Sequence, residues 1–333
     1  MDTTTHALAG YVIAKTGISG DTGKWGTITG VTAAVLPDVD LFLGLLGTEV
    51  SLKYHRNLTN SVFLIIPLSL VLAWAIVRIS KVRRFWTFFL IGVVEILVHT
   101  FMDLATSYGT MILSPFSNHR FALDWLFIVD FLLVFAFLFP LIALHIWKSK
   151  SQVVARFSVL LAGLYVGLCA YNHSWALSLA RNYAGEKNLA VVNVAALPQP
   201  LSPFRWANYV QTEKRIYQGF VNLIGGNEED RAHGTSFLSR LKARYQPIAG
   251  LRYREWERFD NSTWVKKALR LDGVKTFYWF ARFPVAKHKI GENGAHRVEF
   301  FDLRFGMIHS IRPFLYVVDF DHNGAVVFQG FLE

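Results

Sequence analysis

This chain is short of the residues from which several common kinds of site are built. It has one cysteine, Cys169, so it can form neither an intramolecular disulfide nor a CxxC metal site. Cys169 lies in an apolar run, where we expect it to serve packing. The C-terminal half contains neither a Ser-His-Asp ordering nor a glycine-rich phosphate loop. The sequence therefore excludes a disulfide framework and gives no support to a serine hydrolase or a P-loop enzyme.

Charged residues are also scarce, and they are unevenly distributed. Only 17% of the residues are charged, 53% are hydrophobic, and the mean hydropathy is +0.31, whereas a soluble domain carries about 25% charged residues. The first 180 residues contain 12 basic and nine acidic side chains, and the rest of the chain contains 22 and 15. This distribution predicts a membrane region followed by a basic soluble domain, whose charge favours contact with anionic headgroups.

Long apolar runs fill the first half. A spanning helix needs about 20 apolar residues, and four runs reach or approach that length, at 61–79, 85–101, 125–147 and 157–180. Two weaker runs precede them, at 6–17 and 26–47. The first is short for a span, and it has no basic n-region or A-x-A site, so we expect no cleaved signal peptide. We predict a helical membrane domain over residues 1–180 with five or six segments, and a second domain over residues 181–333.

Basic residues in the short loops predict the orientation. The loops at 78–84 and 148–156, with Lys24, carry most of the lysines and arginines of the membrane half, and such loops face the cytoplasm. We therefore expect a multi-pass protein of a bacterial inner or plasma membrane whose C-terminal domain is extracytoplasmic. If the segments alternate, nearly every histidine and aspartate of the membrane half lies on the outer face, together with Arg56; these residues include Asp2, His6, Asp38, Asp40, His55, His99, Asp103, His119, Asp124 and Asp130.

The types and spacing of these residues suit metal binding. His99 and Asp103 are four residues apart, so both project from one helical face and can ligate one ion. Glu95, one turn earlier, is expected to support His99 from behind. Asp38 and Asp40 follow Pro37, where a break in a membrane helix is tolerated only if it is packed or lines a cavity. Histidine and carboxylate ligands favour zinc, manganese or iron, and two such ions would suit phosphoester hydrolysis.

Several short motifs carry a resemblance to a known family. "MDTTTHALAG", "VLPDVD", "HRNLTNS", the spacing from His99 to Asp103, and "SYGTMILSPFSNHRFALDWLFIVD" occur in that order over residues 1–135. They resemble the membrane-bound metal-dependent hydrolase family typified by YdjM, whose members show D-x-x-T-H, P-D-x-D, H-R-G-x-T-H-S, H-x-x-x-D and Y-G-T…PFS…D. The resemblance implies a metal-dependent hydrolase.

The resemblance also implies a set of site residues. We assign as metal ligands Asp2, His6, Asp38, His55, His99 and Asp103, and as catalytic residues Asp40 and Arg56. The metal we expect is a divalent transition metal, zinc first, with manganese and iron as alternatives. The sequence departs from the family pattern at two positions, because Asn57 replaces the glycine and Asn60 replaces the second histidine. Asn60 is a poorer zinc ligand than imidazole, which implies one ligand fewer, a harder ion or lost chemistry.

The C-terminal half shows a different pattern. Segments 188–197, 205–223, 275–286, 296–306 and 314–330 are rich in β-branched and aromatic residues with period-2 alternation in places. Asn323-Gly324 predicts a hairpin, and we predict helices at 235–245 and 261–271. The aromatic residues could form a lipid- or glycan-binding face, but we favour a sheet core. The fold class we predict is a multi-span α-helical membrane domain followed by a soluble α+β domain with an antiparallel sheet.

Two function classes remain open on these patterns. The first is a metal-dependent hydrolase at the outer membrane face that acts on a phosphoester or lipid-linked substrate. The second is a non-catalytic membrane scaffold or transport accessory in which the polar cluster is structural. The partners we expect are membrane lipid and a small-molecule or lipid-linked substrate, with no nucleic acid. Measuring bound metal would separate the two classes.

Overall fold

The protein is described by a computed structural model that covers residues 1–146, 151–225, 243–291, 294–306 and 313–332. Its backbone contacts divide it into two compact units. The first unit comprises Met1–Leu45, Lys53–Trp175 and Leu197–Trp206. The second comprises Leu46–Leu52, Ala176–Ala196 and Ala207–Glu333. The predicted helix at 235–245 lies mostly outside the described residues.

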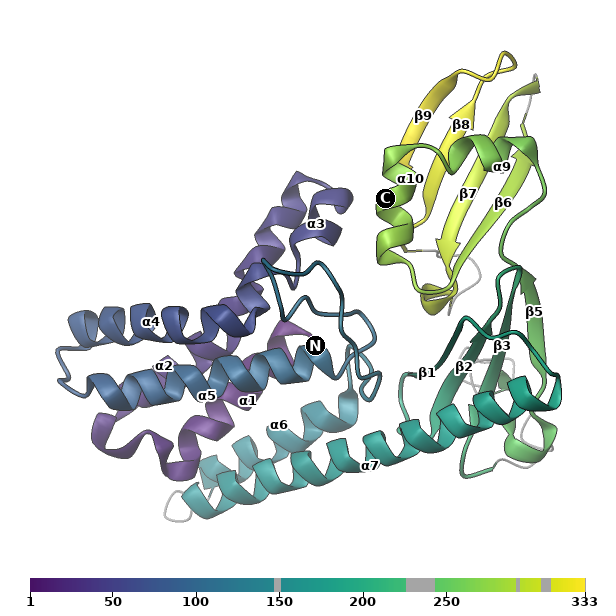
Figure 1. Ribbon diagram of the computed structural model, residues 1–333. Coiled ribbons are helices and arrows are strands. Elements are labelled where there is room, and N and C mark those ends of the chain that lie inside the picture. Colours follow the sequence, from purple (N-terminus) through teal and green to yellow (C-terminus); the bar gives the residue numbers. More distant parts are fainter. Residues whose placement is uncertain (147–150, 226–242, 292–293, 307–312, 333) are drawn as a thin grey trace. The chain divides into compact units, whose positions relative to one another are not determined.

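The first unit is helical (Figure 1). The α-helices of the chain up to the sheets are α1 (Thr3–Ile13), α2 (Lys24–Val35), α3 (Thr48–Tyr54), α4 (Ile65–Ser80), α5 (Phe85–Leu104), α6 (Phe131–Ile146) and α7 (Ser151–Glu186). Shorter turns of other helix types lie at Ala14–Ile18, Gly20–Thr22, Leu36–Leu46, Leu58–Asn60 and Val62–Leu64. Among the described residues, four stretches are long and apolar enough to cross a membrane: Lys24–Leu46, Val62–Ser80, Phe85–Leu104 and Ser151–Glu186. The predicted helical membrane region is confirmed.

One predicted segment begins later than the apolar run suggests. The run from 125 becomes helical only at Phe131, because the residues before it pair with other backbone. Leu123 N donates to the Leu104 carbonyl at 2.8 Å, and Trp125 N donates to the Ala105 carbonyl at 2.8 Å. The described helix α6 has 16 residues, which at 1.5 Å per residue is about 24 Å.

Glycine permits the close packing of α1 on α2. A Cβ atom added to Gly10 would lie 2.5 Å from the Ala34 Cβ and 2.7 Å from the Gly30 carbonyl oxygen, so a larger side chain would push the helices apart. A separate apolar core joins α2, α4 and α5; it contains Ala33, Ile65, Leu72, Ala73, Ile76, Phe88, Ile91 and Ile96. Cys169 is buried in another apolar cluster of this unit, as the packing interpretation predicts.

The irregular segment between α5 and α6 satisfies its backbone groups within the protein. Met111 N donates to the Arg56 carbonyl at 2.9 Å, and Val62 N donates to the Ile112 carbonyl at 3.0 Å. Thr110 and Phe121 form an isolated antiparallel bridge. Non-helical backbone next to a membrane segment needs such internal partners, and these bonds fix residues 105–130 beside the turn that carries Arg56.

The second unit contains two sheets. The first has β1 (Asn193–Pro198), β2 (Arg205–Gln211), β3 (Arg215–Asn222), β4 (Gln246–Pro247) and β5 (Tyr253–Glu257), with β4 parallel and β5 antiparallel to β3. The second is an antiparallel meander of β6 (Pro284–Ile290), β7 (His296–Asp302), β8 (Tyr316–Phe320) and β9 (Val326–Phe331). The predicted α+β class with antiparallel pairing is confirmed, and so is the hairpin, whose turn places Gly324 at φ 83°.

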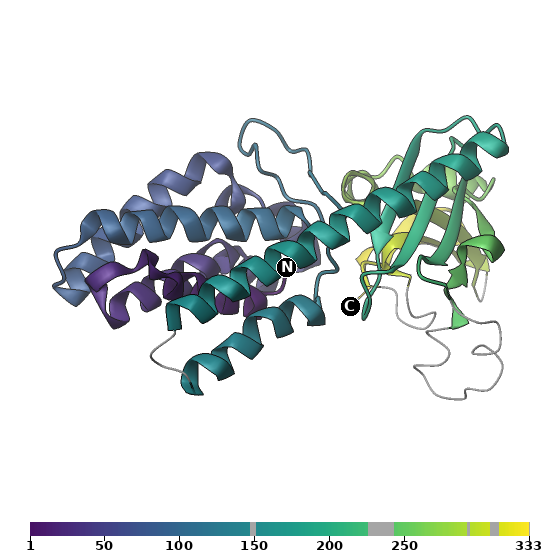
Figure 2. The same cartoon turned by 90° about the horizontal axis from the view of Figure 1, so that it is seen from below.

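Helices cover both sheets. Figure 2 shows the C-terminal turns of α7 lying against the first sheet, where Tyr183 stacks on Tyr253 with ring centroids 3.9 Å apart. The second sheet is covered by α9 (Thr263–Ala268) and α10 (Asp272–Phe280). The prediction of a helix at 261–271 is correct in place, although the structure ends the first helix at Ala268.

The strand-like interpretation of 275–286 is partly wrong. Residues up to Phe280 are helical, and β6 begins at Pro284. Aromatic content favoured a strand, but the buried residues of α10 are Val274, Phe277 and Phe280. Their spacing of three places them on one helical face, from which Val274 and Phe277 pack on the second sheet and Phe280 on the ring of Phe305.

Candidate metal centre

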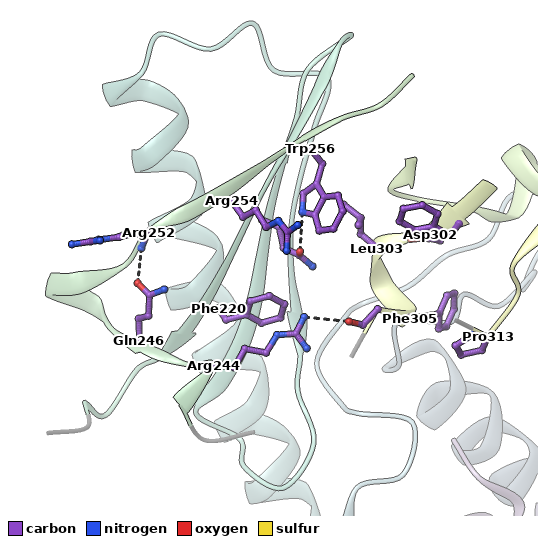
Figure 3. Close-up of a pocket in the computed structure, with 13 residues that line it drawn as sticks. Phe220, Arg244, Gln246, Arg252, Arg254, Trp256, Asp302, Leu303, Phe305 and Pro313 are labelled. Atoms are coloured by element: carbon purple, nitrogen blue, oxygen red, sulfur yellow. Dashed lines mark hydrogen bonds between the residues drawn. The ribbon is translucent and has the colours of Figure 1, made fainter. Parts of the chain in front are cut away.

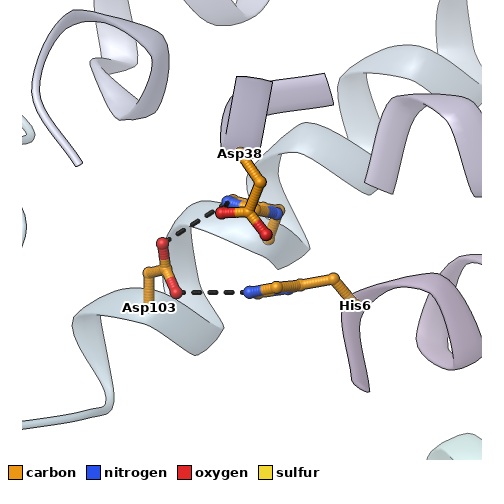
Figure 4. Close-up of side chains that lie close together, drawn as sticks. His6, Asp38 and Asp103 are labelled. Atoms are coloured by element: carbon orange, nitrogen blue, oxygen red, sulfur yellow. Dashed lines mark hydrogen bonds and ion pairs between the residues drawn. The ribbon is translucent and has the colours of Figure 1, made fainter. Parts of the chain in front are cut away.

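Four buried side chains converge where α1, α5 and the turn after α2 meet. His6, Asp38, His99 and Asp103 each offer one ligand atom, and these atoms all lie within 4.8 Å of one another. In Figure 4, Asp38 and His6 approach Asp103 from different sides. The rings of His6 and His99 stack with centroids 3.8 Å apart. The structure thus brings together four of the six residues assigned as metal ligands.

A backbone carbonyl fixes the orientation of His99. Its Nδ1 lies 2.7 Å from the carbonyl oxygen of Ala34, and since a carbonyl only accepts, Nδ1 carries the proton and donates. The other ring nitrogen, Nε2, lies 3.6 Å from Asp38 Oδ1 and 3.4 Å from Asp103 Oδ2, and it makes no hydrogen bond. In the neutral ring Nε2 carries a lone pair, which faces two carboxylates. Three acceptors that face one another are unfavourable unless a cation or a proton lies among them.

Asp103 is the most connected member of the group. Its Oδ1 lies 3.2 Å from His6 Nε2 and 3.0 Å from Arg56 Nη2, and the N-terminal amino group of Met1 also contacts it. Its Oδ2 accepts a hydrogen bond from Asn60 Nδ2 at 2.7 Å. Asn60, where the sequence departs from the family pattern, therefore points at a member of the group.

Asp38 is held from the other side by α1. Thr3 Oγ1 donates to Asp38 Oδ2 at 2.6 Å. Asp38 and Asp40 are buried, whereas Val39, Leu41 and Phe42 between and after them are exposed. The turn after Pro37 thus directs its carboxylates into the protein and its apolar side chains outward.

Asp40 and His55 form a second polar pair. His55 Nδ1 lies 2.8 Å from Asp40 Oδ1, while Asp40 Oδ2 accepts from the Arg56 backbone N–H at 2.9 Å and from Thr59 Oγ1 at 2.7 Å. Among the described residues, His55 is not one of the four whose ligand atoms lie close enough together to hold one metal ion. Arg56 joins the two sets, because its backbone binds Asp40 and its side chain binds Asp103.

Arg56 is a buried cation rather than a membrane-interface one. Its Nη1 donates to Thr106 Oγ1 at 2.8 Å, its Nη2 donates to the Met1 carbonyl at 3.1 Å, and its guanidinium lies 5.0 Å from the centroid of the Tyr108 ring. The residue has φ 58°, a left-handed backbone that is uncommon outside glycine. This geometry turns the side chain toward Asp103.

Two other predicted residues have different positions. Asp2 caps α1, because its Oδ1 accepts from Thr5 N at 3.0 Å and its Oδ2 accepts from Thr5 Oγ1 at 2.5 Å. The expectation that Glu95 supports His99 is wrong, since the Ala34 carbonyl binds the available Nδ1. Glu95 is buried, and neither of its carboxylate oxygens has a hydrogen-bond partner.

The donor set fits a divalent cation. Zinc ligands lie about 2.0–2.2 Å from the ion and thus at most about 4.4 Å from one another, close to the separations seen here. The two carboxylates face the guanidinium of Arg56 and the amino group of Met1, whereas the Nε2 lone pair of a neutral His99 has no donor, and a buried polar atom without a partner is costly. The cluster could therefore hold a metal ion, with His6, Asp38, His99 and Asp103 as its ligands.

Several supporting groups were absent from the sequence predictions. They are Thr3, Thr59, Thr106 and the carbonyl of Ala34. Thr3 and Thr59 lie inside the motifs "MDTTTH" and "HRNLTNS", so their positions were a signal that could have been used. The contact of the Ala34 carbonyl could not be predicted, because every residue has a backbone carbonyl whatever its side chain.

Comparison with known proteins agrees with these motifs. The profile of the YdjM inner membrane protein family matches residues 1–176. A curated relative, the uncharacterized protein YfhP of Bacillus subtilis (strain 168), is 27% identical over 180 residues, which is 51% of this chain and 52% of that protein. The chain thus spans about half the length of the curated relative it matches. No solved structure matches the chain. Since the family profile covers more than half of the chain and includes every residue of the cluster, this membrane protein belongs to the YdjM inner membrane protein family.

Proposed function

We propose that this protein is a metal-dependent hydrolase of the cell membrane that acts on a phosphoester or lipid-linked substrate. The observation that carries the proposal is His99 Nε2, which faces Asp38 and Asp103 without a hydrogen bond while Ala34 holds the opposite ring nitrogen. A divalent ion held by His6, Asp38, His99 and Asp103 would supply Lewis acidity toward a phosphoryl or carbonyl oxygen. Zinc is the ion we expect first, with manganese and iron as alternatives.

The pair of Asp40 and His55 supports an acid–base role. Asp40 accepts the Nδ1 proton of His55, which leaves the Nε2 atom able to take up a proton from a nucleophile. The His55 side chain is 13% exposed, whereas those of His6 and His99 are fully buried. We assign His55 as general base, Asp40 as the group that orients it, and Arg56 as the cation that ties this pair to Asp103.

The surroundings of the cluster favour a substrate that approaches from lipid. The turn that carries Asp38 and Asp40 exposes Phe42, Leu45 and Leu46, and the stretch Lys24–Leu46 is a candidate membrane span. We assign this end of the helices to the outer membrane face, with the C-terminal domain extracytoplasmic. That domain would then meet the headgroups of the same leaflet.

The test is metal analysis of the full-length protein purified in mild detergent, combined with a screen of phosphoesters and phospholipids. The wild type should carry about one equivalent of a transition metal and hydrolyse at least one of the substrates, and a chelator should stop that hydrolysis. His99→Gln should lose both properties, and Arg270→Gln, an exposed change in the second unit, should keep both. Less than about 0.2 equivalents of metal in folded wild type, or no difference between the two variants, would refute the proposal.

One observation favours the alternative of a structural cluster in a scaffold or transport accessory. Asp103 already receives hydrogen bonds or ion pairs from Arg56, Asn60 and His6, and a proton on His99 Nε2 would complete the balance. In that case His99→Gln would lower thermal stability without any change in metal content. The same preparations would separate the two functions.

A further inference from the structure

The second unit contains a cavity between its two sheets that the metal centre does not involve. Its volume is about 280 Å³, and its wall includes Phe220, Arg244, Arg254, Trp256 and Asp302. We call it the Arg244–Arg254 pocket. Phe220 lies on β3 and Trp256 on β5, while Asp302 ends β7, so both sheets contribute to the wall.

Two guanidinium groups lie on aromatic rings of this pocket. The Arg244 guanidinium is 3.6 Å from the centroid of Phe220, and that of Arg254 is 4.1 Å from the centroid of Trp256. Figure 3 shows both beside these rings, whereas the guanidinium of Arg252 points away. Cation–π contact of this kind holds a guanidinium flat on a ring, and its N–H groups then point along the edge of the plane.

The aromatic platform is itself fixed. Trp256 Nε1 donates to Gln218 Oε1 at 3.1 Å, and Gln218 Nε2 donates to the buried Tyr209 hydroxyl at 2.9 Å. Arg244 Nη2 donates to the Gly306 carbonyl at 3.3 Å. These bonds orient Trp256 and Arg244 before any ligand arrives, which reduces the entropy lost on binding.

Among the described residues of the wall, arginines outnumber acidic residues, with Arg244, Arg252 and Arg254 against Asp302. Asp302 accepts hydrogen bonds from the backbone N–H groups of Arg282 and Arg304 and from Arg304 Nε, so its charge is already balanced. Arg254 forms no ion pair with an acidic residue of the described chain. Burial lowers the pKa of the Arg244 guanidinium, and the nearby charge of Arg254 acts in the same direction. An anion between the two guanidinium groups would relieve that repulsion.

We propose that the Arg244–Arg254 pocket binds a phosphate ester that carries an apolar or ring-bearing body. Arginine pairs bidentately with phosphate oxygens, and Phe220 and Trp256 offer ring faces to the attached body. The volume accommodates a small soluble ester or the headgroup of a lipid. The proposal rests on this pocket alone and does not depend on the metal centre.

The experiment is binding by calorimetry to full-length protein in a non-ionic detergent, after treatment with EDTA so that no metal ion can hold phosphate. The probes are phenyl phosphate, inorganic phosphate, dioctanoyl phosphatidate and dioctanoyl glycerol. We expect phenyl phosphate or dioctanoyl phosphatidate to bind saturably and more tightly than inorganic phosphate, and dioctanoyl glycerol not to bind. Arg254→Gln should weaken binding about tenfold, and Arg270→Gln, an exposed arginine outside the wall, should leave it unchanged.

The outcomes are distinct. Preference for phenyl phosphate assigns a soluble ester, and preference for dioctanoyl phosphatidate assigns a lipid headgroup; both support the pocket. No saturable binding by any probe overturns the proposal, and so does equal weakening in Arg254→Gln and Arg270→Gln. Because the protein is free of metal in every titration, these results stand whether or not the hydrolase proposal survives.

Discussion

Each unit buries an aspartate against an arginine, and both aspartates are surrounded by donors, but only one of them also lies beside acceptors. Asp302 in the second unit is surrounded by donors, since the N–H groups of Arg282, Phe283 and Arg304 and the Arg304 side chain all point to it. Asp103 in the helical unit is contacted by Arg56, Asn60 and the Met1 amino group, but it also shares its space with the Asp38 carboxylate and the lone pair of a neutral His99. Both carboxylates are buried.

The presence of neighbouring acceptors distinguishes a carboxylate that could bind a cation from one that is purely structural. A buried acid whose neighbours are all donors gains stability from a complete set of hydrogen bonds. A buried acid that lies beside a second carboxylate and an unprotonated ring nitrogen leaves acceptors without donors, and such donor sets bind cations. Burial of a carboxylate alone therefore does not indicate a function. What indicates a binding site is whether the neighbouring groups include further acceptors.

The largest expected effect is loss of metal from the helical unit. In Asp103→Asn or His99→Gln the metal affinity should fall at least about 100-fold, because each change removes a direct ligand from a group of four. Metal titration of purified protein in detergent measures this. Glu95→Gln is the matched control, since Glu95 lies on the same helix without a hydrogen bond to the group, and it should retain the metal. Retention by both ligand variants would place the metal elsewhere.

The next effect concerns turnover without loss of metal. His55→Ala should lower the hydrolytic rate by about 10²–10⁴-fold, the usual contribution of a general base, while metal content stays at the wild-type level. His119→Ala, an exposed histidine in the segment after α5, serves as control and should retain the rate. A parallel fall of metal content in His55→Ala would make His55 a ligand, as the family resemblance implies.

A stability effect is expected at the structural aspartate. Asp302→Asn removes the charge that balances buried Arg304, so unfolding of the second unit should become easier by about 3–5 kcal/mol. Asp319→Asn breaks the partly exposed pair with Arg297 and should cost less than about 1 kcal/mol. Denaturant unfolding monitored by fluorescence compares them. Metal content should be unchanged in both variants. A loss of metal from Asp302→Asn would mean that Asp302 is not purely structural.

The smallest effect tests the departure from the family pattern. Asn60 donates to Asp103 at 2.7 Å, so Asn60→His places an imidazole beside the group and should raise zinc affinity about tenfold. Asn57→Gly restores the other family residue. It should leave the affinity unchanged, because the Asn57 side chain contacts Ser114 and the Lys53 carbonyl rather than the group. Competition with a zinc-binding dye distinguishes the two. No gain in Asn60→His would mean that an imidazole at this position does not reach the ion.

Much of the architecture could be predicted because it depends on local patterns. Apolar runs and the rise in charge after residue 180 predicted helices followed by an α+β region, and alternation with Asn323-Gly324 predicted the β8–β9 hairpin. The spacing of His99 and Asp103 predicted a shared helical face, since helical periodicity is set by the backbone alone. Where two local signals conflicted, as in the aromatic segment that forms α10, the packing of Val274, Phe277 and Phe280 decided between helix and strand.

The sequence by itself determined which residues could ligate a metal and that nearly all of them lie toward one end of the helices. Tertiary structure decided how they are distributed: His55 pairs with Asp40, Asp2 caps α1, and the Ala34 carbonyl rather than Glu95 orients His99. The Asp2 cap is local, but the contacts of His55 with Asp40 and of His99 with Ala34 join residues 15 and 65 positions apart in the chain. Gly10 allows the close approach of α1 to α2, and only the packed helices fix which side chains meet, because residue type specifies what a group can bind and not what lies opposite it.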